Sequence, residues 1–188
     1  MIILVGHSAS GKTSIANDLI KRYGFKKFIT YTTRKMRVGE VNDVDYHFVS
    51  KEEFIKMKDD NEFIETMEYN DNFYGSSYRD VGDNKVLIVD VRGANYFSEL
   101  NNDNNVFFYV YCNEEETIKR MKLRGDKQED IEKRLKSDKE LFNKSLMNKV
   151  DYEMDTSKSQ IEAITDEVLR LYNSVIINKL HKFYLYKP

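Results

Sequence analysis

Eight residues near the start of the chain have the types and spacing of a phosphate-binding loop. Residues 6–13 read Gly-His-Ser-Ala-Ser-Gly-Lys-Thr, which fits the pattern G-x-x-x-x-G-K-[ST]. Its two glycines let the backbone take angles that other residues avoid, so that several N–H groups can converge on a phosphate. The lysine of such a loop reaches the β- and γ-phosphates, and the threonine hydroxyl binds Mg²⁺. The loop therefore predicts an ATP site with Thr13 as the Mg²⁺ ligand, formed by Gly6, Ser8, Ala9, Ser10, Gly11, Lys12, Thr13 and Ser14.

The neighbouring residues predict the strand and the helix that must hold this loop. Residues 2–5 are all apolar, as in a buried strand, and the helical pattern of residues 14–22 extends to about Tyr23. The alternative is a chance match in a glycine turn, which would not be expected to lie between a strand and a helix. Strand, loop and helix together indicate a nucleotide site.

Charge and composition exclude several classes of function. The chain has 188 residues, with 30 basic and 32 acidic side chains mixed along it and a net charge of −2. Nucleic-acid binding usually leaves a basic face or tail, and no apolar stretch approaches the ~20 residues that span a bilayer. One cysteine, Cys112, and three scattered histidines lack metal-site spacing, so Mg²⁺ brought by the nucleotide is the only metal expected. We expect a cytoplasmic monomer or homodimer that binds small molecules, and neither nucleic acid nor a membrane.

Strands and helices alternate in the second part of the sequence. Long apolar runs there are typical of buried parallel strands, and Asn113 with Glu116 is a typical helix start. The alternation favours a parallel α/β sheet with right-handed crossovers. In order, we expect a strand at 86–91, a short helix after Gly93, a strand at 106–112, helices at 114–124 and 129–148, a strand at 152–154 and a helix from 157 to about 172.

The stretch from about residue 30 to residue 80 breaks this alternation. Ser50 with Glu53 forms a capping box that predicts one short helix. The rest is polar, turn-rich or alternating in the manner of strands, which we expect at 46–49, 63–69 and 72–78. This mostly β segment is the natural candidate for an inserted lobe that holds a second substrate.

Further motifs connect the loop to a known family. The chain has Thr-Thr-Arg-Lys-Met-Arg-Val-Gly-Glu at 32–40, Asp-Tyr-His-Phe at 45–48, Phe-Ile-Glu at 63–65 and Tyr-Gly-Ser at 74–76. Arg120, Arg124-Gly125 and Arg134-Leu135 follow. With the phosphate loop, this ordered set closely resembles the guanylate kinase family of nucleoside monophosphate kinases. That family has the patterns T-T-R-x-P-R-x-G-E, D-Y-x-F, F-[LI]-E, Y-G-[ST] and R-x-x-x-R-G, and the resemblance covers about residues 1–172.

The resemblance implies an activity and a domain arrangement. The activity is in-line transfer of a phosphoryl group from Mg-ATP to GMP, and also to dGMP. The fold is a P-loop NTPase-type three-layer α/β fold with a parallel sheet. Its expected parts are a core at about 1–29 and 80–172, an inserted, mostly β GMP-binding lobe at about 30–79, a short helical lid at about 120–134, and a C-terminal tail at 173–188 that packs on the body or on a partner.

Within the lobe, the resemblance assigns residues to the two ends of GMP. Arg34 and Arg37 suit the phosphate, because planar guanidinium groups bind a dianion with paired hydrogen bonds. Glu65 suits guanine, whose N1–H and amino group can both donate to one carboxylate, and adenine lacks that pair of donors. The implied GMP-binding set is Thr30, Arg34, Arg37, Tyr46, Glu65, Tyr74, Gly75 and Ser76, with Thr30 in place of a family serine.

The transfer step requires positioning and positive charge rather than a covalent intermediate. The resemblance implies that Arg120 stacks on adenine and that the residues near 125–128 act as a moving lid. The expected catalytic set is Lys12, Arg34, Asp90, Arg124 and Arg134.

The sequence departs from the family at the end of one strand. The family usually has x-D-x-D-x-Q-G, but this chain has Ile88-Val89-Asp90-Val91-Arg92-Gly93. The loss of the first acid keeps open a kinase of the same fold with a different acceptor, either another nucleoside monophosphate or a ribose phosphate. A third reading is a non-catalytic guanylate-kinase-like module that binds protein. The intact phosphate loop and the lid arginines argue against it.

Overall fold

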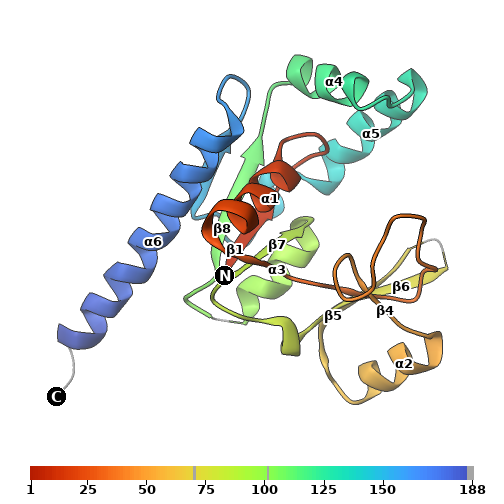
Figure 1. Ribbon diagram of the computed structural model, residues 1–188, viewed down its shortest axis with the longest axis horizontal. Coiled ribbons are helices and arrows are strands. Elements are labelled where there is room, and N and C mark those ends of the chain that lie inside the picture. Colours follow the sequence, from red (N-terminus) through yellow and green to blue (C-terminus); the bar gives the residue numbers. More distant parts are fainter. Residues whose placement is uncertain (70, 101, 186–188) are drawn as a thin grey trace.

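The protein consists of a parallel sheet with helices on both faces and a smaller sheet beside it (Figure 1). The computed structural model describes residues 1–69, 71–100 and 102–185. Within these ranges the main sheet has the order β2-β7-β1-β8-β9, and all neighbouring strands are parallel. Its strands are β1 (Ile2–Val5), β2 (Lys26–Lys27), β7 (Lys85–Val89), β8 (Val106–Tyr111) and β9 (Tyr152–Asp155).

The central strand β1 divides the interior into two cores. Its four side chains are fully buried, and successive ones point to opposite faces of the sheet. Ile2 and Leu4 pack against α1 (Lys12–Tyr23) and α6 (Ile161–Leu185). Ile3 and Val5 pack instead against α3 (Val91–Glu99). The result is the three-layer α/β arrangement that the alternating pattern predicts, and that prediction is confirmed.

The second sheet forms a lobe with one helix. Among the described residues it has the order β4-β3-β6-β5. The helix α2 (Lys51–Asp59) begins at the expected capping box, in which Ser50 and Glu53 each bond to the other's backbone N–H. Phe54 of α2 stacks on Phe63, with ring centroids 4.5 Å apart, and so closes the small core of the lobe. The strands are β3 (Tyr31–Thr32), β4 (His47–Phe48), β5 (Phe63–Tyr69) and β6 (Asn72–Ser77).

The lobe leaves and rejoins the core along neighbouring strands. β3, where the chain enters, pairs antiparallel with β6, and Tyr31 lies opposite Gly75. After β6 the chain returns to the main sheet through Asp80, whose carboxylate accepts a hydrogen bond from Lys85 of β7 at 2.8 Å. His47 of β4 lies 3.3 Å from the same carboxylate through its Nε2. Asp80 therefore connects the lobe to the core.

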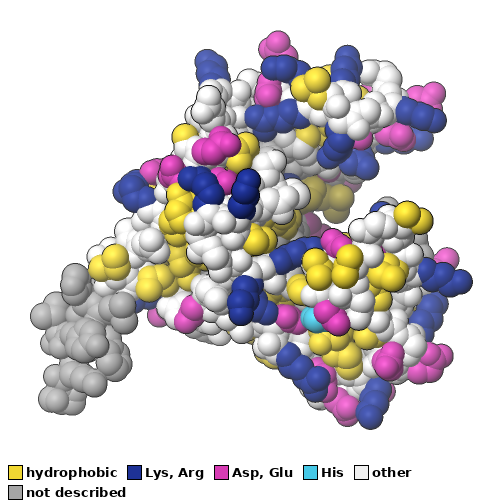
Figure 2. Space-filling model, viewed as in Figure 1, with side chains coloured by type: hydrophobic (Ala, Val, Ile, Leu, Met, Phe, Trp, Pro, Cys, Tyr) yellow, Lys and Arg dark blue, Asp and Glu magenta, His cyan; other side chains and the backbone are white. Residues whose placement is uncertain are grey.

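Two helices project from the main sheet on the side opposite the lobe. α4 (Glu114–Leu123) is capped as expected by Asn113, which accepts from the N–H of Glu116 at 2.8 Å. α5 (Gln128–Leu141) follows after a break that contains Gly125, with φ +86°. Figure 1 places the α4–α5 pair opposite the lobe, and Figure 2 shows the surface hollowed between them.

Three details differ from the expectations. The helix expected at 129–148 ends at Leu141, because the carbonyl of Phe142 accepts a hydrogen bond from the Tyr109 hydroxyl at 2.7 Å and leaves the helical path. The last helix begins at Ile161 instead of residue 157, and it does not end near residue 172 but continues to Leu185, through residues that we expected to form a separate tail. Residues 186–188 of that tail lie outside the described residues. The short strand β3 was not predicted.

Long helices raise the question of a membrane span. No helix in the described part of the chain combines the length and the apolar character needed to cross a bilayer.

Candidate active site

The phosphate loop follows β1 and leads into α1, as its motif requires. Gly6 has φ +151°, and a Cβ atom there would lie 1.9 Å from the carbonyl oxygen of Val110, so only glycine fits between the loop and β8. Gly11 caps α1 with φ +101°. The first turn of α1 therefore presents its N–H groups at the end of the loop.

Lys12 is folded back onto the loop that carries it. Its ammonium donates to the carbonyl oxygens of Gly6 at 2.5 Å and His7 at 2.7 Å, and to the Ser10 hydroxyl at 3.3 Å. Burial lowers the pKa of Lys12 to about 8, although the nearby carboxylate of Asp138 acts in the opposite direction. An arriving phosphate would supply the negative charge that this buried ammonium lacks.

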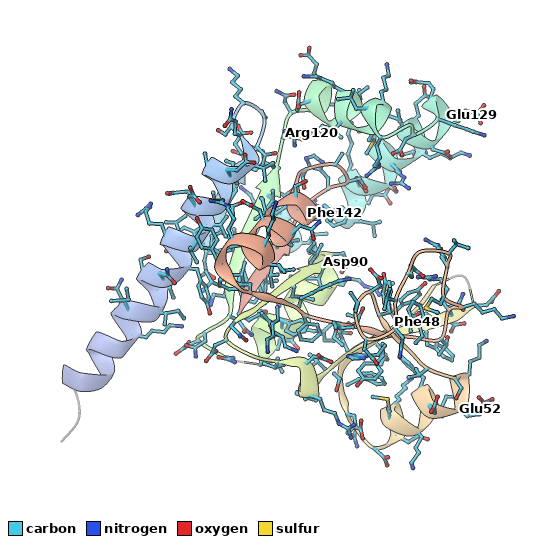
Figure 3. All side chains as sticks on the ribbon, in the orientation of Figure 1. Phe48, Glu52, Asp90, Arg120, Glu129 and Phe142 are labelled. Carbon is cyan, nitrogen blue, oxygen red and sulfur yellow. The ribbon has the colours of Figure 1, made fainter. Side chains whose placement is uncertain are left out.

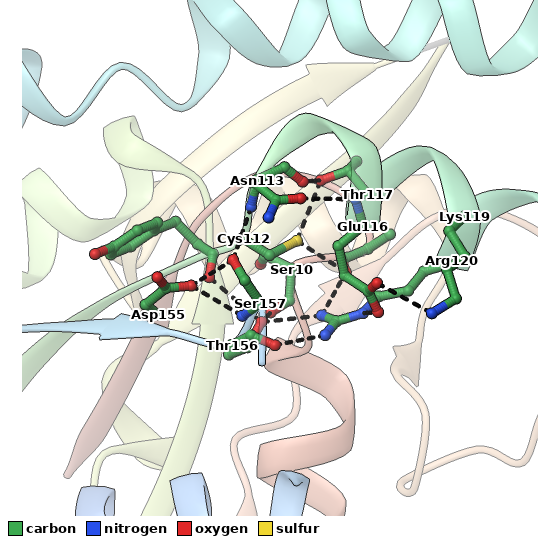
Figure 4. A network of polar contacts seen from close by, with 12 residues as sticks. Ser10, Cys112, Asn113, Glu116, Thr117, Lys119, Arg120, Asp155, Thr156 and Ser157 are labelled. Carbon is green, nitrogen blue, oxygen red and sulfur yellow. Dashed lines mark hydrogen bonds and ion pairs between the residues drawn. The ribbon is translucent and has the colours of Figure 1, made fainter. Parts of the chain in front are cut away.

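A cavity of about 440 Å³ lies beside the loop and brings together residues that the sequence assigned to ATP. Arg120 reaches it from α4 and is fixed on three sides (Figure 4). Its guanidinium donates to Glu116 at 3.0 Å, to the Thr156 carbonyl at 2.6 Å and to the Ala9 carbonyl at 3.3 Å. The lining residues are Ala9, Gly11, Lys12, Thr13, Ser14, Arg120, Arg124 and Ile161.

The two other lid arginines lie farther out. Arg124 forms an ion pair with Asp126, and this hydrogen bond raises the pKa of Arg124. Arg134 is exposed on α5, and its positive charge contributes to the lowered pKa of Asp126. Both positive charges therefore act on the Asp126 carboxylate, and Arg124 also lines the cavity beside the phosphate loop.

In the lobe, Glu65 and Ser76 face the same side of the sheet on β5 and β6. They are paired in register, and the Ser76 hydroxyl donates to Glu65 Oε1 at 2.7 Å. Burial raises the pKa of the Glu65 carboxyl, while the Ser76 hydrogen bond opposes the shift. The charges of Asp90 and Arg92, from the core, act on the same carboxyl. Glu65 is therefore a half-buried acceptor that faces the core across the hollow.

Arg34 lies near the two tyrosines assigned with it. Its guanidinium makes a two-pronged ion pair with Glu40, at 2.7 and 3.0 Å, and this pairing raises its pKa. It also lies over the ring of Tyr46 at 5.4 Å, and the Tyr46 and Tyr74 rings are 6.2 Å apart. The Arg37 side chain is exposed and makes no hydrogen bond to this group, but its charge adds to the Arg34 hydrogen bond in lowering the pKa of Glu40, and its backbone N–H bonds to the same carboxylate.

Asp90 lies at the edge of the main sheet from which the phosphate loop also begins. Val5 and Val89 are opposite each other in the sheet, so Gly6 and Asp90 leave adjacent strands at the same edge. Asp90 caps α3 by accepting from the N–H of Gly93 at 2.8 Å. Ile88 is 39% exposed and lines a second cavity of about 610 Å³, which shares Thr13 with the cavity beside the phosphate loop. Thr30 and Tyr46, both assigned to GMP, line this second cavity as well.

Comparisons with known proteins agree with this geometry. A sequence model described as Guanylate kinase matches residues 1–174. The guanylate kinase of Clostridioides difficile (strain 630) is 32% identical, over 95% of this chain and 94% of that protein. That of Onion yellows phytoplasma (strain OY-M) is 33% identical, over 81% of this chain and 76% of that protein. The chain belongs to the guanylate kinase family. A crystal structure of guanylate kinase from Anaplasma phagocytophilum superposes with a TM-score of 0.62 and 25% identity, covering 93% of this chain and 84% of that chain.

Membership of the guanylate kinase family accounts for the motifs quoted from the sequence. Two further residues contact the phosphate loop, and neither of them was assigned to the site from the sequence. Thr156 donates to the Ser10 carbonyl at 2.8 Å and also accepts from Arg120 at 2.9 Å, so it joins the loop to α4. Asp138 of α5 accepts from the Ser8 N–H at 2.7 Å. No local sequence pattern marks Asp138, because its burial and its contact with Ser8 are set by the tertiary structure.

Proposed function

We propose that this chain transfers the γ-phosphoryl group of Mg-ATP to GMP, and to dGMP. Membership of the guanylate kinase family supports a nucleoside monophosphate kinase, and the half-buried carboxylate of Glu65 carries the assignment of guanine. Two adjacent N–H donors of guanine match this carboxylate, whereas the wrong base would leave its charge unpaired in a partly desolvated place.

On the donor side, the cavity beside the phosphate loop is the proposed ATP site. Lys12 and the N–H groups at the start of α1 bind the phosphates, and Arg120 supports the base. Thr13 fits the role of a Mg²⁺ ligand, since its exposed hydroxyl lines this cavity next to Lys12 and hydroxyl oxygen suits a hard cation. When bound, Mg²⁺ neutralises charge on the β- and γ-phosphates.

On the acceptor side, Arg34, Tyr46 and Tyr74 bind the phosphate of GMP, and Arg37 joins them when the loop closes. An oxygen of that phosphate attacks the γ-phosphorus, and the bond to the β,γ-bridging oxygen breaks, so that ADP leaves with the electron pair. Lys12, Arg124 and Arg134 stabilise the charge on the migrating group, and movement of the turn near residues 125–128 excludes water. Asp90, at the edge between the two sites, orients the acceptor.

The decisive experiment measures ADP release from Mg-ATP with GMP, dGMP, AMP, CMP, UMP and ribose 5-phosphate offered in turn. We expect turnover with the two guanine nucleotides and at least about 10²-fold lower kcat/KM for the others, because Glu65 accepts paired donors only from guanine. Equal activity with AMP would contradict the assignment.

The exposed Ile88 supports one alternative, a kinase of the same fold with another acceptor. A preference for a ribose phosphate in the same panel would establish it. Failure of every acceptor would favour a non-catalytic module.

A further inference from the structure

The end of the helix α5 contacts the phosphate loop through Asp138. The carboxylate of Asp138 accepts from the Ser8 N–H at 2.7 Å, and the residue is only 9% exposed. One turn further, the ring of Phe142 lies 5.4 Å from the Lys12 ammonium (Figure 3). The end of α5 therefore packs directly on the loop that is proposed to bind ATP.

α5 has little apolar attachment to the rest of the protein, and its exposed Lys139 also pairs with Glu114 of α4 at 3.6 Å. All of its residues are described, and of these only Ile131 and Asp138 are buried. Its remaining positions are mostly charged and exposed, so burial of apolar surface contributes little to holding the helix in place. A buried carboxylate persists only if it is hydrogen-bonded, and the charge-assisted bond to the Ser8 N–H meets that condition.

Asp138 and Arg134 lie on the same face of α5. They are four residues apart, which places side chains one above the other on a helix. Arg134 is exposed, and its charge acts on Asp126 beside Arg124. A helix fixed to the loop at Asp138 therefore fixes the distance between the loop and Arg134.

We propose that Asp138 is a positioning residue for phosphoryl transfer. It fastens α5 to the phosphate loop and so holds Arg134 in reach of the migrating phosphoryl group, an inference that rests on the proposed function of the site. Asp138 does not contact the substrates in this role; it acts through Arg134. The opposite role, in which the carboxylate competes with the ATP phosphates for the loop, predicts the opposite result in the test below.

The test compares Asp138→Ala and Asp138→Asn with Glu140→Ala, which removes an exposed carboxylate from the same helix. Asp138→Ala should lower kcat by about tenfold or more and change KM for GMP by less than about twofold, since the lobe is untouched. Asp138→Asn keeps an acceptor oxygen for the Ser8 N–H and should restore kcat to within about threefold of wild type. Glu140→Ala should match wild type.

A double-mutant cycle with Arg134→Ala separates positioning from general stability. If Asp138 acts through Arg134, then Asp138→Ala should cost almost nothing further in the Arg134→Ala background. Independent, additive losses would overturn the proposal, as would unchanged kcat in Asp138→Ala. Higher activity or tighter ATP binding in Asp138→Ala would establish competition instead.

Hydrogen exchange provides a readout that does not depend on the acceptor. Exchange of the backbone N–H groups of residues 128–141 should rise in Asp138→Ala and stay unchanged in Glu140→Ala. If wild type fails to phosphorylate GMP, the proposed function fails, and the exchange measurement still decides whether Asp138 anchors α5. Unchanged exchange in Asp138→Ala would overturn the anchoring itself.

Discussion

The donor side and the acceptor side of the hollow are built in different ways. On the donor side, the ammonium of Lys12 is bound by the backbone carbonyls of Gly6 and His7, and only the outer cations, Arg120 and Arg124, pair with carboxylates. On the acceptor side, charged side chains are paired with one another, as Arg34 is with Glu40. Carbonyl oxygens leave the positive charge uncancelled, whereas a carboxylate neutralises it. The positive charge of Lys12 is therefore available to an anion without rearrangement, whereas Arg34 must exchange Glu40 for its substrate.

The largest effect on activity is expected from a substitution of Lys12. Lys12→Ala removes the ammonium held at the centre of the loop, and we expect kcat/KM to fall by about 10³-fold with every acceptor, because no other group can replace a buried charge at the transferred phosphoryl. Lys21→Ala, which removes an exposed lysine from the same helix, should retain full activity. Steady-state kinetics measures both. Retained turnover in Lys12→Ala would show that the preformed Lys12 ammonium is not needed for transfer from ATP.

The next largest effect is expected at Glu65. Glu65→Gln should lower kcat/KM for GMP by about 10²-fold, because one acceptor for the guanine donors becomes a donor itself. ATP binding, measured with a fluorescent analogue, should stay unchanged. Glu68→Gln is the matched control, since Glu68 is exposed on the same strand. Equal loss in both variants would mean that the strand, and not the Glu65 carboxylate, is responsible.

A smaller effect is expected at Arg34. Arg34→Lys keeps the charge and loses the planar fork that now binds both oxygens of Glu40. We expect KM for GMP to rise by about tenfold and KM for ATP to stay the same. Lys35→Ala, an exposed neighbour, provides the control. If KM for ATP rose as well, the two sides would not be independent.

The smallest effect is a pH dependence of the donor side alone. ATP binds best to the protonated form of Lys12, and its pKa in the free protein is lowered to about 8 by burial. At that pH half of the lysine is uncharged, so kcat/KM for ATP should fall to about half of its neutral-pH value and decrease about tenfold per further pH unit. A flat profile up to the ordinary pKa of lysine would show that Lys12 is not desolvated as the structure indicates.

The two sides also differ in how far the sequence predicted them. Gly6 and Lys12 act through a continuous motif, so their placement follows from local geometry. Glu65, Ser76 and Arg34 come from separate segments, and only the family resemblance linked them. Asp138 was missed because its contact with Ser8 joins residues 130 positions apart, which no local pattern reports.

Helix ends were predicted less well than helix starts. Starts are marked by side-chain caps, such as Ser50 and Asn113, that can be recognised in the sequence. The end of α5 depends on a distant group, the Tyr109 hydroxyl. α6 continues to Leu185 because neither glycine nor proline interrupts it, and a helix of such residues needs a breaker to stop it.

The pairing of β3 with β6 has a consequence for how this molecule could be modified. Because the lobe enters and leaves on adjacent strands, with Tyr31 opposite Gly75, its two ends are already close together in space. A segment with such ends can be exchanged as a cassette, since the rest of the chain needs only to close a short gap. Residues 30–79 can then be replaced as one unit while the phosphate loop stays as it is.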